Sequence, residues 1–194
     1  SGSKNATLPI FFASILADNP LKLLNTPQLS DVSTTLRLLM EMGSNFVLEE
    51  DGSIFIDSST LNNLTADYSL VKTMRASILT LGPMLAKYKK AKISLPGGCA
   101  IGTRPVNLHL DALEKMGAKI EVKNGYIHAS AKELVGTQIN FDLVSVTATE
   151  NILMAATLAK GITTINNAAQ EPEVTDLIYC LKNMGAKITG ENTS

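Results

Sequence analysis

The chain has 194 residues, 45% of them apolar, and a formal net charge of −1, which together predict a soluble globular protein that buries one core. This balance excludes the basic field that attracts nucleic acid or an anionic membrane surface. No apolar run approaches the roughly 20 residues of a membrane span, and no signal-peptide pattern opens the chain. Two cysteines without metal-ligand or disulfide spacing favour a reducing, cytoplasmic location.

The first unit, over 1–67, predicts an apolar helix, a strand, an amphipathic helix and a hairpin. The amphipathic helix ends in Met42-Gly43, where the glycine fits a left-handed C-terminal cap. Asp51-Gly52 is a short hairpin signal. The predicted elements cover 5–17, 21–24, 32–42, 45–49 and 54–56.

The second unit, over 68–143, repeats this order. Its amphipathic helix ends in Met116-Gly117, and its hairpin turns at Asn124-Gly125. The predicted elements cover 70–86, 91–95, 106–116, 118–122 and 126–128. Between its first strand and its amphipathic helix stands a long loop, 97–103, for which the other two units have only short or polar connections.

The third unit, over 144–194, predicts an apolar helix, a strand and an amphipathic helix that ends in Met184-Gly185, followed by a strand. These elements cover 147–159, 162–165, 174–184 and 186–189. In all three units the apolar residues of the amphipathic helix recur at the same distances from the glycine, which lays one stripe along each helix. We therefore expect one α/β domain of three units, with buried apolar helices inside and small sheets outside.

The elaborated loop is the first candidate site, because repeats maintain a fold and the asymmetric element suggests a function. It places Cys99 among three glycines, with Arg104 five residues further on, which suits a mobile reactive thiol beside a cation. An incidental cysteine in a surface loop is the alternative. Arg104-Pro105 opens a helix, where free backbone N–H groups favour anions, and a solvated charge at the helix start is the alternative for Arg104. Arg75 lies in an apolar helix and should face a carboxylate, a ligand anion or solvent.

Other candidate groups favour structural roles. Cys180 is expected to be a packed, inert thiol, and His109 and His128 are expected at the surface or at a helix cap. Glu171-Pro172-Glu173 suits a helix start. No cluster of His, Cys and carboxylates has metal-ligand spacing, so neither a metal nor another cofactor is expected.

Several segments, in order along the chain, resemble the UDP-N-acetylglucosamine 1-carboxyvinyltransferases of the enolpyruvyl transferase family. The matching segments are Lys4-Asn5-Ala6, Leu8-Pro9, Lys72-Thr73-Met74-Arg75-Ala76-Ser77, Leu95-Pro96-Gly97-Gly98-Cys99, Gly102, Arg104-Pro105-Val106 and Glu171-Pro172-Glu173. The resemblance implies an inverted α/β barrel domain of three βαβαββ units. Family members have two such domains with the active site between them, so the chain resembles the half that bears the cysteine loop.

The resemblance implies transfer of the enolpyruvyl group from phosphoenolpyruvate to the 3′-hydroxyl of UDP-N-acetylglucosamine, a step in peptidoglycan precursor synthesis. It makes Cys99 the general acid, which also forms an adduct with phosphoenolpyruvate and is alkylated by fosfomycin. Phosphoenolpyruvate contacts are implied for Lys4, Asn5, Arg75 and Arg104. UDP-N-acetylglucosamine contacts are implied for Arg75, Arg104, Pro105, Val106, Asn107, Leu108, Leu143, Val144, Ser145 and Val146.

Two departures weaken the nucleotide contacts, because many members carry aspartate at the position of Asn107 and some carry lysine at that of Leu143. The catalytic aspartate base and further arginines belong to the second domain. We therefore expect the chain alone to be nearly inactive and to self-associate through the face where that domain would dock. The alternatives are a non-catalytic UDP-sugar-binding module and a 5-enolpyruvylshikimate-3-phosphate synthase, whose family lacks the cysteine loop.

Overall fold

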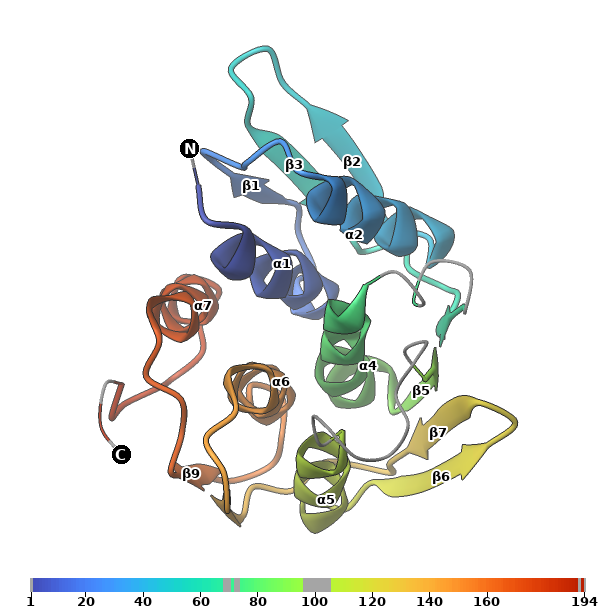
Figure 1. The fold of residues 1–194 in the computed structure, drawn as a ribbon, viewed down its shortest axis with the longest axis vertical. Coiled ribbons are helices and arrows are strands. Elements are labelled where there is room, and N and C mark those ends of the chain that lie inside the picture. The colour runs from blue at the N-terminus through green and yellow to red at the C-terminus, as the bar shows by residue number, and fades with distance from the viewer. Residues whose placement is uncertain (1, 68–70, 72–73, 96–105, 192, 194) are drawn as a thin grey trace.

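Helices form the centre of the molecule and three small sheets lie around them (Figure 1). The computed structural model describes residues 2–67, 71, 74–95, 106–191 and 193. The predicted combination of inner helices and outer sheets is confirmed.

The inner helices are α1 (Lys4–Ala13), α4 (Leu81–Tyr88) and α6 (Val146–Ala156), and most of their residues are buried. A 3₁₀ turn, η1 (Ser14–Leu16), extends α1, and a second, η2 (Arg75–Thr80), precedes α4. The prediction of one continuous helix over 70–86 is therefore wrong in the part described. Pro83 lacks an N–H group and is best tolerated in the first turn of an α-helix, which agrees with a start at Leu81.

The amphipathic helices are α2 (Ser30–Glu41), α5 (Asn107–Lys115) and α7 (Pro172–Asn183). Each ends at the predicted glycine, with φ of 102° at Gly43, 98° at Gly117 and 103° at Gly185. In each, the glycine N–H and the next N–H bond back to carbonyls of the last turn, at 2.9 to 3.0 Å. This arrangement satisfies carbonyls that would otherwise lack partners at the helix end. The three predicted caps are confirmed.

The first two sheets contain the predicted hairpins. In the first sheet β3 (Ile54–Asp57) lies between β1 (Leu21–Leu23) and β2 (Asn45–Leu48), and both pairings are antiparallel. In the second, β7 (Tyr126–Ser130) lies between β5 (Lys90–Ser94) and β6 (Lys119–Lys123) in the same way. Asn124 and Gly125 both have positive φ at the turn of the second hairpin, as an Asn-Gly turn requires.

The structure contains two short strands that were not predicted and lacks one strand that was. β4 (Thr65–Ala66) pairs in parallel with β5, and β8 (Gln138–Asn140) pairs in parallel with β9 (Thr164–Asn166). Both begin just before the predicted unit boundaries, and each pairs with a strand of the following unit. The expected strand over 186–189 does not form, because no return strand pairs with it among the described residues.

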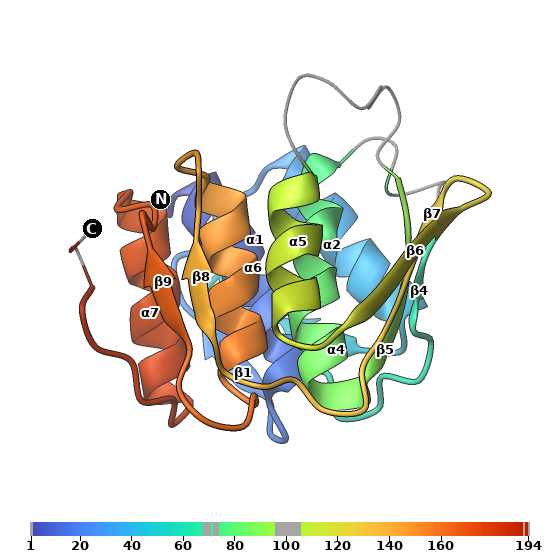
Figure 2. The same ribbon diagram turned by 90° about the horizontal axis from the view of Figure 1, so that it is seen from below.

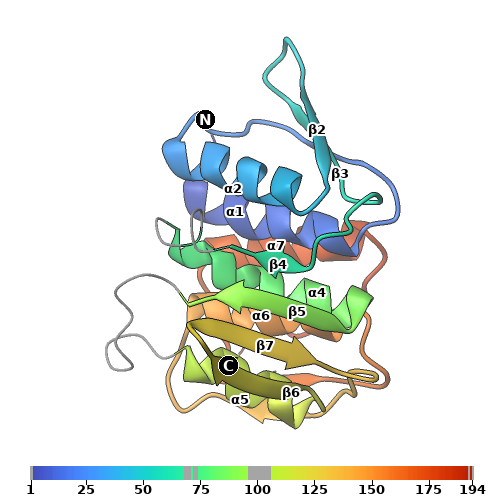
Figure 3. The ribbon, with the colours of Figure 1, turned by 90° about the vertical axis from the view of Figure 1, so that its right-hand side faces the viewer.

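One large core joins the elements. It runs from Leu8 in α1 to Leu181 in α7 and includes the fully buried Phe11, Phe12 and Leu85. In Figure 2 the helices stand side by side, and in Figure 3 the second sheet covers one side of them. This packing holds the helix ends in fixed relative positions.

Candidate active site

Five helices begin at the same end of the molecule, which we call the helix-start end. Lys4 of α1 reaches Asp31 of α2, and Asn5 of α1 reaches Glu173 of α7. One hollow is lined both by Val144, just before α6, and by Glu171, just before α7. Thr147 of α6 lies 3.3 Å from the ring of His109 in α5. Helix starts present free N–H groups and the positive ends of the helix dipoles, so their convergence favours anionic ligands.

Lys4 and Asn5 are the exposed first residues of α1. The Lys4 ammonium lies 2.9 Å from Asp31 Oδ2, and the Asn5 amide donates a hydrogen bond to Glu173 Oε1 at 3.4 Å. Because these side chains are exposed and their partners are at the surface, they are available to a ligand at the helix-start end. Asp31 was not among the predicted site residues, although its place in the first turn of an amphipathic helix indicates the dipole interaction it makes.

The implied UDP-contacting residues that the structure describes flank the starts of two neighbouring helices. Val106, Asn107 and Leu108 stand at the start of α5, and the segment 143–146 at the start of α6. The Ser145 hydroxyl caps α6 by accepting the Ala148 N–H at 3.3 Å. A shallow hollow of about 410 Å³ lies beside this segment, lined by Val144, Asn167, Ala168, Gln170 and Glu171.

The structure describes only some of the predicted catalytic and binding residues. Cys99, Arg104 and Pro105 fall outside the described residues. Arg75 is described as the first residue of η2, without its side chain. The structure therefore brings Lys4, Asn5, Asn107 and Ser145 to one end of the molecule and leaves the contacts of the cysteine loop as predictions.

A buried carboxyl group, Glu150, lies below the start of α6. The residue is 2% exposed, and its Oε1 atom has no hydrogen-bond partner among the residues that the structure describes. Burial, together with the carboxylates of Glu173 and Glu171, raises the pKa of Glu150 to about 8, so the group is mostly protonated at neutral pH. Sequence analysis missed it, although a charged residue in a helix expected to be apolar was a usable signal.

A buried polar network joins α5, α6 and the start of α4. Asn151 donates hydrogen bonds to the Ile78 carbonyl at 3.1 Å and to His109 Nδ1 at 2.9 Å, and its Oδ1 accepts the Gly82 N–H at 2.7 Å. Because the amide N–H is a donor, Nδ1 must accept, and the His109 proton lies on Nε2, facing Thr147. Burial lowers the pKa of His109 to about 4, so the ring is neutral. The expectation that His109 lies at the surface or caps a helix is wrong.

Cys180 behaves as predicted. It lies within α7, and burial raises the pKa of its thiol to about 11, which suppresses the reactive thiolate. His128 is half-buried on β7. Among the described residues no group of His, Cys, Asp and Glu could hold a metal ion. No described helix is long and apolar enough to cross a membrane.

Comparison with models of protein families identifies the family of the chain. A family model described as EPSP synthase (3-phosphoshikimate 1-carboxyvinyltransferase) matches residues 1–194. The chain belongs to this family. The predicted membership of the enolpyruvyl transferases is thus confirmed.

Several curated proteins have high sequence identity to this chain. Two proteins named UDP-N-acetylglucosamine 1-carboxyvinyltransferase, from Ruthia magnifica and Vesicomyosocius okutanii, are 74% and 73% identical over the whole chain. A relative of the same name from Hydrogenovibrio crunogenus is 56% identical. The chain covers 46% of each, so it spans about half the length of these relatives.

Solved structures share the fold. The enolpyruvyl transferase NikO from Streptomyces tendae matches 97% of the chain with a TM-score of 0.85 at 20% identity, and the chain covers 44% of it. An EPSP synthase from Acinetobacter baumannii matches 90% of the chain with a TM-score of 0.71 at 19% identity, and the chain covers 41% of it. At these identities the likeness concerns the fold alone, and it confirms the expected enolpyruvyl transferase fold.

Proposed function

We propose that the chain is the cysteine-bearing half of a UDP-N-acetylglucosamine 1-carboxyvinyltransferase. The observation that carries this proposal is the 74% identity, over the whole chain, to a relative of that name. The reaction transfers the enolpyruvyl group of phosphoenolpyruvate to the 3′-hydroxyl of UDP-N-acetylglucosamine. It is a step in the synthesis of peptidoglycan precursors in the bacterial cytoplasm.

The proposed chemistry is addition followed by elimination. The sugar hydroxyl attacks C2 of phosphoenolpyruvate while C3 takes up a proton, and the adduct then loses a proton from C3 and expels inorganic phosphate. The reaction needs an acid for C3, a base for the hydroxyl, and cationic or N–H groups for the phosphate and carboxylate. The converging helix starts and Lys4 supply part of the electrostatic requirement.

We assign the roles of individual residues by their place in the family motif. Cys99 is the acid on the loop, and Lys4, Asn5, Arg75 and Arg104 bind phosphoenolpyruvate, with both arginines also close to the nucleotide sugar. The starts of α5 and α6 hold the UDP moiety through 105–108 and 143–146. The three repeat units of this chain together form one domain of the whole enzyme. The base and further cations come from its second domain.

Two other functions are distinguishable from this one. The matching family model carries the description of an EPSP synthase, which would use a phosphorylated shikimate as acceptor. Two observations argue against a phosphorylated shikimate as the acceptor. The chain has low identity to the solved EPSP synthases, and it has the Cys-bearing loop. A non-catalytic half-domain would bind the nucleotide sugar and release no phosphate.

The decisive experiment restores the missing half. We would replace the corresponding half of the Ruthia magnifica relative with this chain and measure phosphate release from phosphoenolpyruvate with either acceptor. We expect release with UDP-N-acetylglucosamine and not with shikimate 3-phosphate. Cys99→Ala should lower turnover by about a hundredfold or more, since general acid catalysis contributes at least that much.

The matched control is Cys180→Ala, which removes a partly buried thiol of α7 and should leave turnover unchanged. Equal turnover in the Cys99→Ala and unsubstituted chimeras would contradict the assigned acid. Release only with shikimate 3-phosphate would assign the EPSP-type reaction. The chain alone should release little phosphate, and calorimetry with UDP-N-acetylglucosamine then tests whether it is a binding half-domain.

A further inference from the structure

The outer face of the second sheet bears a hollow at the side of the molecule. This face belongs to β4, β5, β7 and β6 and points away from the helices, since α4 packs behind β5 and β7 (Figure 3). The hollow has a volume of about 580 Å³, within the range of small-molecule sites. Its polar lining side chains belong to Asn62, Thr65, Lys90, Lys92, Lys119, Glu121, His128 and Ser130.

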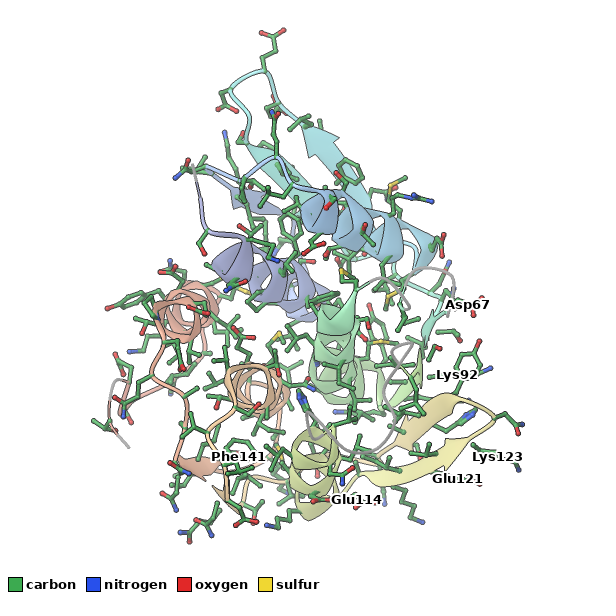
Figure 4. The ribbon with its side chains drawn as sticks, viewed as in Figure 1. Asp67, Lys92, Glu114, Glu121, Lys123 and Phe141 are labelled. Carbon is green, nitrogen blue, oxygen red and sulfur yellow. The ribbon has the colours of Figure 1, made fainter. Side chains whose placement is uncertain are left out.

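Strand register brings the lysines together. Ser130 of β7 is the partner of both Lys90 and Lys119, so these two lysines flank one residue on the same face. In the next outward row His128 stands between Lys92 and Glu121. Because outward residues recur at every second position, the rows are adjacent on one surface. Figure 4 shows Lys92 and Glu121 on this side of the molecule.

The positive charge of this face is largely unpaired. Within the described part of the chain, neither Lys90 nor Lys119 has a side-chain hydrogen bond or ion pair. Lys92 lies over the Tyr126 ring at 4.4 Å. Among the described residues that line the hollow, Glu121 is the one carboxylate, against three ammonium groups. In a chain whose net charge is −1, this is a local concentration of positive charge.

The first sheet shows that the fold does not require these lysines. It has the same strand order, with β3 between β1 and β2, but its outward residues are Lys22, Phe55 and Val47 in one row and Asp57 and Asn45 in the next. Its single lysine is compensated, because Lys22 lies 3.8 Å from Asp51 and over the Phe55 ring. The lysine cluster is therefore a feature that the second sheet does not share with the first.

The hollow is separate from the helix-start end. β5 leads toward the cysteine loop through Ser94, whereas the hollow is lined by Lys90, Ala91 and Lys92 at the other end of that strand. At about 3.3 Å per residue, Lys90 and Ser94 are roughly 13 Å apart. None of the implied substrate contacts that the structure describes lines the hollow.

We propose that this hollow binds a small anion with two or more phosphate groups, with Lys90, Lys92 and Lys119 as its cationic contacts. Three ammonium groups around one concavity match several phosphate oxygens better than they match a single carboxylate. His128 and Ser130 supply further hydrogen-bonding groups on the strand between the lysines. This proposal does not depend on the proposed enzymatic function.

The test is a titration of the 15N-labelled chain with tripolyphosphate at low ionic strength, followed by NMR. We expect saturable shifts of amides in β5, β6 and β7 around Lys90, Lys119 and Ser130. The double variant Lys90→Gln/Lys119→Gln should weaken binding at these amides by about tenfold or more, since each hydrogen bond to a charged group contributes about 1.5–3 kcal/mol. Pyrophosphate compared with ADP then shows whether the nucleoside adds affinity.

The matched control is Lys115→Gln/Lys123→Gln, which removes the same charge from exposed lysines outside the lining of the hollow. It should retain the affinity to within about twofold. Loss of affinity equal to that of the first double variant would mean general charge attraction and would overturn the proposal. Shifts confined to the helix-start end, or no saturation, would overturn it as well.

Discussion

At the scale of single residues, the inner helix α6 buries polar groups of opposite character. Asn151 has hydrogen bonds to three partners and fixes the His109 ring, whereas one carboxyl oxygen of Glu150 has no partner within the described part of the chain. Burial disfavours the charged form of a carboxyl group, so Glu150 is more stable with its proton than without it. The contribution of Glu150 to the free energy of unfolding therefore depends on pH.

Glu150→Gln should make folding less sensitive to pH. The pKa of Glu150 is about 8 in the folded chain, against an ordinary value of 4.5, so the folded state keeps a proton that the unfolded state loses between these values. The Glu150 contribution to the free energy of unfolding therefore falls as the pH rises from about 4.5 to about 8, by roughly a few kcal/mol. Urea unfolding at about pH 5 and about pH 8 should show this decline in the unsubstituted chain and less of it in the variant.

Glu114→Gln is the control for that measurement. Glu114 is exposed on α5, so its removal should leave the pH dependence of unfolding unchanged (Figure 4). If Glu150→Gln and Glu114→Gln give the same pH slope, Glu150 titrates normally and the argument from its burial is wrong.

At the scale of elements, α4 and α6 approach closely at a glycine. A Cβ atom on Gly82 would lie 2.3 Å from the backbone oxygen of Asn151, and 2.5 Å from its Oδ1. The same approach allows the Gly82 N–H to reach that Oδ1 at 2.7 Å. The contact between the two inner helices therefore depends on the absence of a side chain at this position.

Gly82→Ala should separate α4 from α6 and destabilise the chain by about 3 kcal/mol or more, because overpacking against backbone cannot be relieved by a rotamer change. Denaturant unfolding measures the loss. Gly125→Ala is the comparison: a Cβ added there has no described atom within 4 Å, so only the strain of its φ of +77° remains, about 1–2 kcal/mol. Equal losses in the two variants would contradict close packing at Gly82.

At the scale of the whole molecule, the helix-start end exposes apolar side chains. Leu24 is 69% exposed, Leu143 63% and Val144 56%. Leu24 lies there because the neighbouring Asn25 carbonyl accepts the Gly2 N–H just before α1. Exposed apolar residues gathered at one end favour association with another surface.

We expect the chain alone to self-associate through this end, and Leu24→Ser/Leu143→Ser to reduce the association. Sedimentation equilibrium over a range of concentrations measures the change. Ile162→Ser is the control, since Ile162 is 86% exposed and comes two residues before β9, a strand that begins at the opposite end (Figure 2). A monomer at all concentrations, or an equal effect of Ile162→Ser, would contradict this expectation.

Local patterns in the sequence predicted the elements whose stability is local. The three glycine caps, the Asn-Gly hairpin and the buried character of the inner helices follow from spacing and residue type, and the structure contains them. Where pairing depends on a distant segment the predictions were incomplete: β4 and β8 are too short to carry a pattern, and 186–189 is unpaired. The motif segments identified the family because they lie in the same order along the chain.

Tertiary structure decided which side chains meet and which lose water. The contact between Lys4 and Asp31, the neutral His109 beside Asn151 and the protonated Glu150 all join residues from different helices. The lysine-lined hollow likewise depends on the register of three strands. A sequence determines local conformation through spacing along the chain, but desolvation and charge depend on neighbours in space, and those neighbours exist only once the helices and sheets have packed.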